Sequence, residues 1–300
     1  MLFAAHESFH IRDGWLRKGL LGIRNDPLLF AKQFATDELG VGHNMVAAIR
    51  YWLQATDLAH ASTETVDGRR VTRLEWTALA KLIVDHDPYF EAEGTLWVLH
   101  YHLATNERLA TTWYWFFNRF GVRQFTQDLF LSHLHRFVDS QGKRRISPRS
   151  LEKDLRCFVR TYARTQDTGS RTNPEDSFDC PLSALGLLEF LPLTKSYHAL
   201  TPAPELLDPL LVGYALAQMR VKWPMEGSNI TFRDALYAEG SPGRIFLFDA
   251  ELLYSFLGRL ESDERLLTFA RTAGLDLVTL KERNPEEILG RYYARVGATV

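Results

Sequence analysis

The first residues suited to chemistry lie near the amino terminus, where His6, Glu7, His10 and Arg12 form a dense polar cluster. Two histidines four positions apart share one face of a helix and can hold a metal ion. A metal site needs a third ligand, however, and the sequence supplies no assured one. We therefore favour capping, packing or DNA contact for this cluster, with Arg12 as a candidate DNA-binding residue.

A second group of such residues surrounds the apolar stretch Arg244–Phe248, which we expect to be a strand. Its members are the carboxylates Asp234, Glu239, Asp249 and Glu251. Carboxylates beside a strand can collect the divalent cation of a nuclease. Capping of a helix by Asp249, with surface charge elsewhere, is the simpler interpretation. The sequence therefore identifies no catalytic residue and no metal ligand.

Several short catalytic motifs are absent from the chain. The strings GxxxxGK[ST], GxGxxG and GxSxG do not occur, which removes the simplest assignments to nucleotide hydrolysis, dinucleotide binding and serine hydrolysis. The two cysteines, Cys157 and Cys180, are 23 positions apart, so neither a disulfide framework nor a cysteine zinc site is indicated. We expect two reduced thiols, with Cys157 buried beside the apolar side of its helix.

The most specific pattern in the sequence is a helix-turn-helix. Asp26 and Pro27 predict a helix that begins at Pro27. The segment Lys32–Tyr51 then fits the helix-turn-helix pattern, with Gly40 in the turn because glycine tolerates a positive φ. The apolar positions that hold the second helix against the first are Ala35, Leu39, Val41, Val46 and Ile49.

The second helix of this motif has an outward side that suits DNA. Its outward positions are His43, Ala47, Arg50 and Gln54. Small alanines allow a close approach to a groove, while His43, Asn44 and Arg50 can reach phosphates or base edges.

A predicted hairpin follows the helix-turn-helix and would form its wing. Strands over Ala61–Val66 and Arg69–Leu74 flank Asp67-Gly68, a strong signal for a two-residue turn. The returning strand has three arginines that are candidates for contact with the sugar-phosphate backbone: Arg69, Arg70 and Arg73. The alternative is that the winged fold contacts another protein and that its arginines are simply solvated.

A second basic surface is predicted where Ser147-Pro148 begins another helix. One side of this helix is apolar, with Leu151, Leu155, Phe158, Val159 and Tyr162. The opposite side is cationic, with Arg149, Lys153, Arg156, Arg160 and Arg164, and the loop before it contains Lys143, Arg144 and Arg145. Closely spaced cations of this kind suit phosphate contacts whose affinity depends on salt. Solvated charge or an acidic protein partner is the alternative.

The length of the chain predicts a multidomain protein, since 300 residues can form more than one hydrophobic core. We expect a mainly α fold with small β elements: a winged helix-turn-helix domain at 1–87, a helical domain at 88–170 and an α+β domain at 171–300. The polar, turn-rich stretch Gln166–Asp179 is the candidate linker. The chain shows no signal peptide and no apolar run of about 20 residues, which predicts a cytoplasmic protein.

The strings AHESFHIRDGWLRKGL, ELGVGHNMVAAIRYWL and FDCPLSALGLLE resemble landmarks of the SspB-like family of bacterial DNA phosphorothioate modification proteins. The resemblance extends over most of the chain. It implies a DNA nickase that opens one strand during sulfur modification within an anti-phage defence system. It also implies protein partners, namely a cysteine desulfurase, an ATPase and a sulfur-inserting enzyme.

Nicking rests on this resemblance alone, whereas DNA binding is also predicted by the residues. The candidate cofactors of a metal-dependent nickase are Mg²⁺ and Mn²⁺. The chief alternative is a non-enzymatic winged-helix regulator or recruitment subunit, and a structural adaptor that contacts only proteins is a third hypothesis. Neither Cys157 nor Cys180 has an activating motif, so sulfur transfer is better assigned to the partners.

Overall fold

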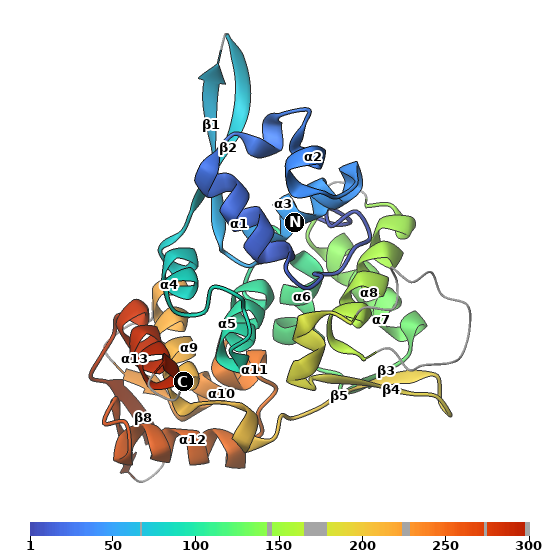
Figure 1. The fold of residues 1–300 in the computed structure, drawn as a ribbon. Coiled ribbons are helices and arrows are strands. Elements are labelled where there is room, and N and C mark those ends of the chain that lie inside the picture. Colours follow the sequence, from blue (N-terminus) through green and yellow to red (C-terminus); the bar gives the residue numbers. More distant parts are fainter. Residues whose placement is uncertain (67, 143–145, 165–178, 224–228, 273–274, 298–300) are drawn as a thin grey trace.

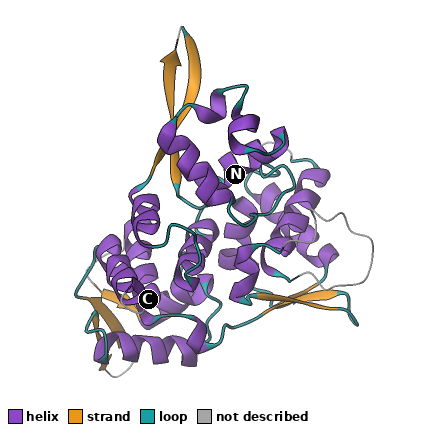
Figure 2. Cartoon of the chain, viewed as in Figure 1, coloured by secondary structure: helices purple, strands orange, loops and turns teal. Residues whose placement is uncertain are grey.

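The structure, a computed structural model, describes residues 1–66, 68–142, 146–164, 179–223, 229–272 and 275–297. Within these ranges the chain is mainly helical, with three small antiparallel sheets, and Figure 2 shows how far the helices dominate. The predicted class, mainly α with small β elements and an α+β carboxyl-terminal part, is confirmed. No helix in the described ranges is long and apolar enough to cross a membrane.

The amino-terminal part is a group of helices from which one hairpin projects (Figure 1). Its elements are α1 (Trp15–Asn25), the 3₁₀ turn η1 (Leu29–Ala31), α2 (Ala35–Leu39), α3 (His43–Ala55), β1 (Ala59–Val66), β2 (Arg69–Trp76) and α4 (Ala78–His86). Strands β1 and β2 are antiparallel, and Val66 pairs with Arg69 across the turn. The predicted hairpin is confirmed, with each strand extending two residues further from the turn than expected.

The helix predicted to begin at Pro27 is wrong. Asp26 does cap the following turn, because its Oδ1 accepts a hydrogen bond from the Leu28 N–H at 3.0 Å. Only η1 follows, and Lys32 is then extended with φ −93° and ψ 149°. This interruption lets Leu29 join a small buried cluster with Ala35, Leu39 and Val46. Burial of Leu29 thus takes precedence over the local helix signal.

The central part packs around one long buried helix. Its elements are α5 (Glu93–Ala104), α6 (Thr111–Trp115), the π-helical turn η2 (Phe116–Phe120), β3 (Gln124–Phe125), α7 (Gln127–Ser140) and α8 (Pro148–Tyr162). Every residue of α5 from Gly94 onward is buried. The aromatic run Trp113–Phe117 is buried as well. The run therefore belongs to the core.

Helix α8 has the amphipathic form that the sequence predicts. Its amino-terminal cap is Ser147, whose Oγ accepts from the Ser150 N–H at 3.2 Å, and Pro148 occupies the first turn. A serine cap of this kind stabilises a helix by about 1 kcal/mol. The residues buried on its apolar side are Leu151, Leu155, Phe158, Val159 and Tyr162. The helix start and the buried side are both confirmed.

The carboxyl-terminal part mixes helices with short strands. Its elements are η4 (Pro181–Leu185), β4 (Leu188–Leu191), β5 (Ser196–Ala199), η5 (Pro204–Leu206), α9 (Pro209–Lys222), β6 (Asn229–Thr231), α10 (Phe232–Tyr237), α11 (Pro242–Ile245), α12 (Ala250–Ser262), β7 (Leu267–Thr272), β8 (Leu275–Leu280) and α13 (Pro285–Gly297). One sheet has the order β3-β5-β4 and the other β6-β8-β7. The predicted linker Gln166–Asp179 lies, apart from Asp179, outside the described residues.

The strand predicted at Arg244–Phe248 is wrong, because α11 occupies its first part. Ser241 caps this helix by accepting from the Arg244 N–H at 3.2 Å, and Pro242 follows at the first helical position. A short apolar run is ambiguous between strand and helix. The Ser-Pro pair before the run is the local signal that decides for a helix.

The last helix, α13, docks on α5 through two tyrosines. The Gly94 N–H donates to Tyr292 Oη at 3.0 Å, and Thr95 Oγ1 lies 2.8 Å from Tyr293 Oη. A Cβ atom at position 94 would lie 2.1 Å from Tyr292 Cζ. A side chain at position 94 would therefore displace the end of the Tyr292 ring.

The first residues of the chain pack between α3 and α8 around the buried carboxylate of Asp154. Its Oδ1 accepts from the Ala4 N–H at 2.5 Å and faces His6 Nε2 at 3.0 Å. Its Oδ2 accepts from Thr112 Oγ1 at 2.6 Å. The Ser8 N–H donates to His6 Nδ1 at 3.0 Å, so the ring proton is on Nε2 and is donated to Asp154. Three donors from two segments thus satisfy one buried charge.

Replacement of Asp154 should destabilise the whole protein. Asp154→Ala leaves three donors without their buried acceptor, and each buried group left unsatisfied costs about 1–3 kcal/mol. Urea denaturation measures the free energy of unfolding. The matched control is Glu152→Ala, since Glu152 is an exposed acid on the same helix, for which we expect a change within about 0.5 kcal/mol. Equal effects of the two substitutions would contradict this account of Asp154.

Candidate nucleic-acid interface and polar pocket

Helices α2 and α3 are joined by a tight turn at Gly40, which has φ 59° as the sequence predicted. His43 and Asn44, in the first turn of α3, are exposed, whereas Arg50 is half-buried. Ile49 lies on the opposite side and is fully buried. The amino-terminal end of α3 is therefore open to a ligand.

The hairpin arginines fall into two groups. Arg69 and Arg70 are exposed near the turn. Arg73 is half-buried and binds two acids, with Nη1 3.3 Å from Glu64 Oε2 and Nε 2.9 Å from Glu75 Oε1. These carboxylates offset its charge, so Arg73 is the weaker candidate for phosphate contact.

Arg12 has a packing role in the structure. Its guanidinium lies 5.4 Å from the ring centroids of both Phe9 and Trp15, within range of a cation–π contact. The side chain is half-buried beside α1. In this respect Arg12 differs from Arg69 and Arg70 of the hairpin, which are exposed.

The cationic side of α8 is exposed as predicted. Arg149, Arg156 and Arg160 are exposed, and Lys153 is half-buried on the same side. Within the described ranges, no acidic side chain forms an ion pair with Arg149, Lys153 or Arg156. The loop residues Lys143, Arg144 and Arg145 lie outside the described residues.

The predicted metal-binding candidates do not come together. His6–His10 has the HExxH spacing of zinc peptidases, which requires both histidines on one helix. Here the segment is a series of turns with positive φ at Glu7 and Ser8, and His6 binds Asp154. In the described part of the chain, no three His, Cys, Asp or Glu side chains are placed to hold a metal ion.

Three of the four carboxylates around 244–248 have separate partners, and Glu251 is exposed on α12. Asp249 caps α12 by accepting from the Leu252 N–H at 2.8 Å, which confirms the simpler interpretation. Asp234 accepts from Thr231 Oγ1 at 2.6 Å. Glu239 binds Tyr114 and Arg119. The structure therefore gives no support to a shared cation site among them.

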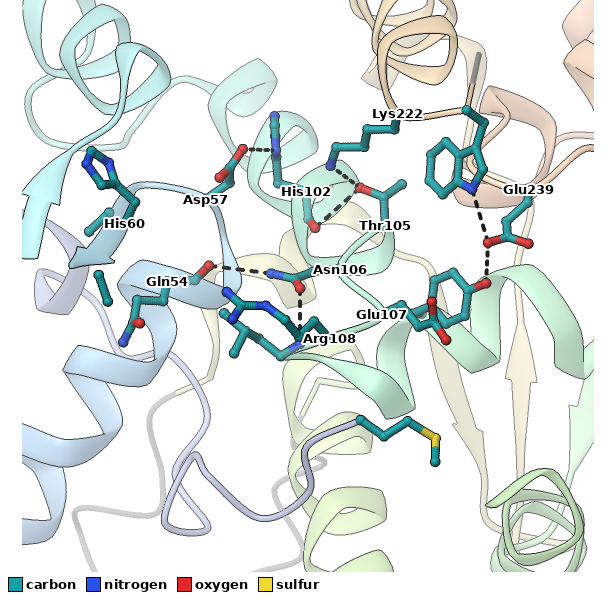
Figure 3. Close-up of a pocket in the computed structure, with 16 residues that line it drawn as sticks. Gln54, Asp57, His60, His102, Thr105, Asn106, Glu107, Arg108, Lys222 and Glu239 are labelled. Atoms are coloured by element: carbon teal, nitrogen blue, oxygen red, sulfur yellow. Dashed lines mark hydrogen bonds and ion pairs between the residues drawn. The ribbon is translucent and has the colours of Figure 1, made fainter. Parts of the chain in front are cut away.

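A polar pocket of about 690 Å³ lies where α3, β1, the α5–α6 loop and the end of α9 meet (Figure 3). On one wall, His102 Nδ1 lies 3.0 Å from Asp57 Oδ2, and Lys222 Nζ donates to Thr105 Oγ1 at 2.8 Å. On another wall, Glu239 accepts from Tyr114 Oη and from Trp223 Nε1. Charged groups of both signs thus face one cavity.

Burial and neighbouring charges shift the pKa values of the groups on the first wall. Burial lowers the pKa of His102, and the nearby Lys222 adds to this effect while Asp57 opposes it. Burial also lowers the pKa of Lys222. For Asp57, burial would raise the pKa, but His102 and Lys222 outweigh it and the pKa is lowered. Shifted groups clustered in a cleft are typical of functional sites.

The sequence did not predict this pocket. His100 and His102, two positions apart on α5, point to different sides of the helix. They do have different partners: His100 contacts Tyr162 Oη and the Ile245 carbonyl, each at 2.8 Å. Asp57 and Lys222 approach each other only through the packing of α5 between them. The one local hint is a lysine at the end of the apolar helix α9.

The fold and the site define a mainly helical protein with an exposed cationic helix face and a separate polar pocket. The chain belongs to the DUF4007 family, described as protein of unknown function, whose profile matches residues 3–293. No curated protein matches the sequence.

Two solved structures of SspB are similar to this chain. An SspB crystal structure has a TM-score of 0.88 and 26% identity, covering 98% of this chain and 88% of that one. A crystal structure of magnesium ion-bound SspB has a TM-score of 0.87 and 25% identity, with coverage of 98% and 88%. The protein is therefore SspB-like, and the resemblance stated from the sequence is confirmed.

The stability of the protein should fall in acid because of the buried histidines. Burial lowers the pKa of His100 to about 4, so the folded chain keeps this ring neutral while the unfolded chain takes up a proton near pH 6.5. The unfolded state then binds more protons, and stability is lost as the pH falls from about 6.5 towards 4.

Urea denaturation of wild type and His100→Gln across this range tests the histidine contribution. The glutamine does not titrate, so the decline should be less steep in the variant by about 1.4 kcal/mol per pH unit. Parallel pH profiles for the two proteins would contradict the assignment to His100.

Proposed function

We propose that this protein binds double-stranded DNA and nicks one strand in a DNA phosphorothioate modification system. The observation that carries DNA binding is the cationic side of α8, whose arginines are exposed to solvent. From Arg149 to Arg160 the row is roughly 16 Å long at 1.5 Å per residue. Duplex DNA presents about one phosphate charge per 1.7 Å of its axis, so a straight row of cations can engage several phosphates at once.

The amino-terminal part supplies the second proposed DNA surface. We infer that α2, α3 and the β1–β2 hairpin act as a winged helix-turn-helix. In this arrangement His43 and Asn44 enter a groove, Arg50 supports them, and Arg69 and Arg70 contact the backbone beside it. Arg12 and Arg73 are secondary candidates because of their existing partners. The likeness to SspB supports a place beside a cysteine desulfurase, an ATPase and a sulfur-inserting enzyme.

Strand nicking is proposed on the likeness to SspB. One of the similar structures is magnesium ion-bound SspB, which favours Mg²⁺, with Mn²⁺ as the alternative cation. The described residues of this chain do not group three carboxylate or histidine ligands. We derive no step of the reaction through a cation.

Loss of two α8 arginines should weaken DNA binding in a salt-dependent way. In the variant Arg149→Ala/Arg156→Ala, the slope of log K against log salt should become less negative by about 0.9 for each lost phosphate contact. Fluorescence anisotropy with duplexes of unrelated sequence measures it, and affinity should fall for all of them. The matched control is Lys81→Ala/Arg233→Ala, which removes two exposed cations outside both surfaces. Equal slopes for the two variants would refute the role of α8.

The nicking activity has a direct test on supercoiled plasmid. With Mg²⁺ or Mn²⁺ and the three partner proteins present, we expect conversion to the open-circular form without linear product. The α8 variant should slow this conversion because it binds DNA more weakly. A plasmid that stays supercoiled under every combination, while anisotropy reports binding, would leave a non-enzymatic recruitment subunit as the function.

A further inference from the structure

The polar pocket is a continuation of the proposed DNA surface. Gln54, which lines it, is one turn beyond Arg50 on the same side of α3, and its Nε2 donates to the Arg50 carbonyl at 3.0 Å. Residues 59–61 of β1 line the pocket as well. The helix and the hairpin that we assign to DNA therefore also form walls of this cavity.

The lining of the pocket is close to neutral and holds both donors and acceptors. Asp57 and Lys222 offset each other on one wall, and Arg119 offsets Glu239 on another. At the mouth, the exposed Arg108 has no ion pair among the described residues and is adjacent to the acid Glu107. A phosphate would require a net positive lining. A nucleobase instead presents donors and acceptors side by side on a neutral ring.

The side chain of Lys222 keeps hydrogen-bonding capacity for a ligand in this cavity. Lys222 Nζ donates to Thr105 Oγ1, and an ammonium group has three donors. Asp57 has a left-handed backbone with φ 61°, held by a hydrogen bond of 2.7 Å from Thr77 Oγ1 to its carbonyl. This conformation belongs to the end of α3, where the Leu58 N–H donates to the Leu53 carbonyl at 2.8 Å, and it places Asp57 in the lining of the pocket. Tyr114 and Trp223 add aromatic surface to the wall.

We propose that this pocket receives a single unpaired nucleobase, delivered from DNA bound along α3 and the hairpin. Lys222 and Asp57 would contact its hydrogen-bonding edge, which is accessible only after the base leaves the stack. The volume of about 690 Å³ is within the usual range for sites of small organic ligands. The proposal rests on the proposed DNA binding, and a free nucleotide is the other source of the same chemistry.

The test uses duplexes that contain one 2-aminopurine, whose emission rises when it is unstacked, and follows binding in parallel by anisotropy. We expect wild-type protein to raise the emission, and to bind a duplex with a mismatch about tenfold more tightly than a paired one, because an unpaired base is easier to extrude. Lys222→Met should lose both effects while anisotropy still reports binding. The matched control Lys81→Met, at an exposed lysine of α4, should keep both.

The outcomes separate this proposal from the proposed function. Duplex binding without any rise in emission overturns the nucleobase pocket and leaves DNA binding intact. If no duplex binds, the proposed function fails, and titration of the protein with 2-aminopurine deoxyriboside then tests the pocket alone. Quenching of the nucleoside emission by wild type but not by Lys222→Met supports a free-nucleotide site. Absence of quenching overturns the proposed pocket. If Lys222→Met does not fold, Arg108→Gln at the mouth of the pocket replaces it. We expect this variant also to lose the rise in emission while it still binds DNA, and an unchanged rise would contradict the proposal.

Discussion

The burial of one carboxylate, that of Asp154, organises the molecule. A buried charge is tolerated only when it is fully hydrogen-bonded, and here the donors come from the amino-terminal segment and from α6. His6, which supplies one donor, also packs against Tyr51 and Trp52 of α3. The orientation of α8 relative to α3 therefore depends on this carboxylate. With Asp154 facing inward, the arginines on the other side of α8 must face solvent.

The distribution of ion pairs explains how a protein of net charge −2 presents a surface for a polyanion. Some arginines elsewhere pair with acids, as Arg73 does with Glu64 and Glu75 and Arg295 does with Glu264. On α8 the acid Asp154 is turned into the core and occupied there. Its charge is thus withdrawn from the surface on which the cations lie. Segregation of charge, and not its total, determines the electrostatic character of that surface.

Features encoded by neighbouring residues could be predicted from the sequence, and features made by distant residues could not. The Ser147-Pro148 cap, the Asp67-Gly68 turn and Gly40 each act within a few positions, and the elements they specify are present. The helix predicted to begin at Pro27 was wrong because burial of Leu29 takes precedence over the local signal for a helix start. The pocket was missed because Asp57 and Lys222 are brought together by packing, for which no local pattern exists.

The docking of Tyr292 on Gly94 joins residues 198 positions apart. Contacts between residues so far apart in the sequence close large loops. The chain loses conformational entropy when such a loop closes, before the contacts can stabilise the folded state. Although helices form early, the central helix cannot complete its packing until Tyr292 has left the ribosome. We therefore expect slow, late folding for a protein so rich in helix, and a nascent chain that exposes apolar surface throughout its synthesis.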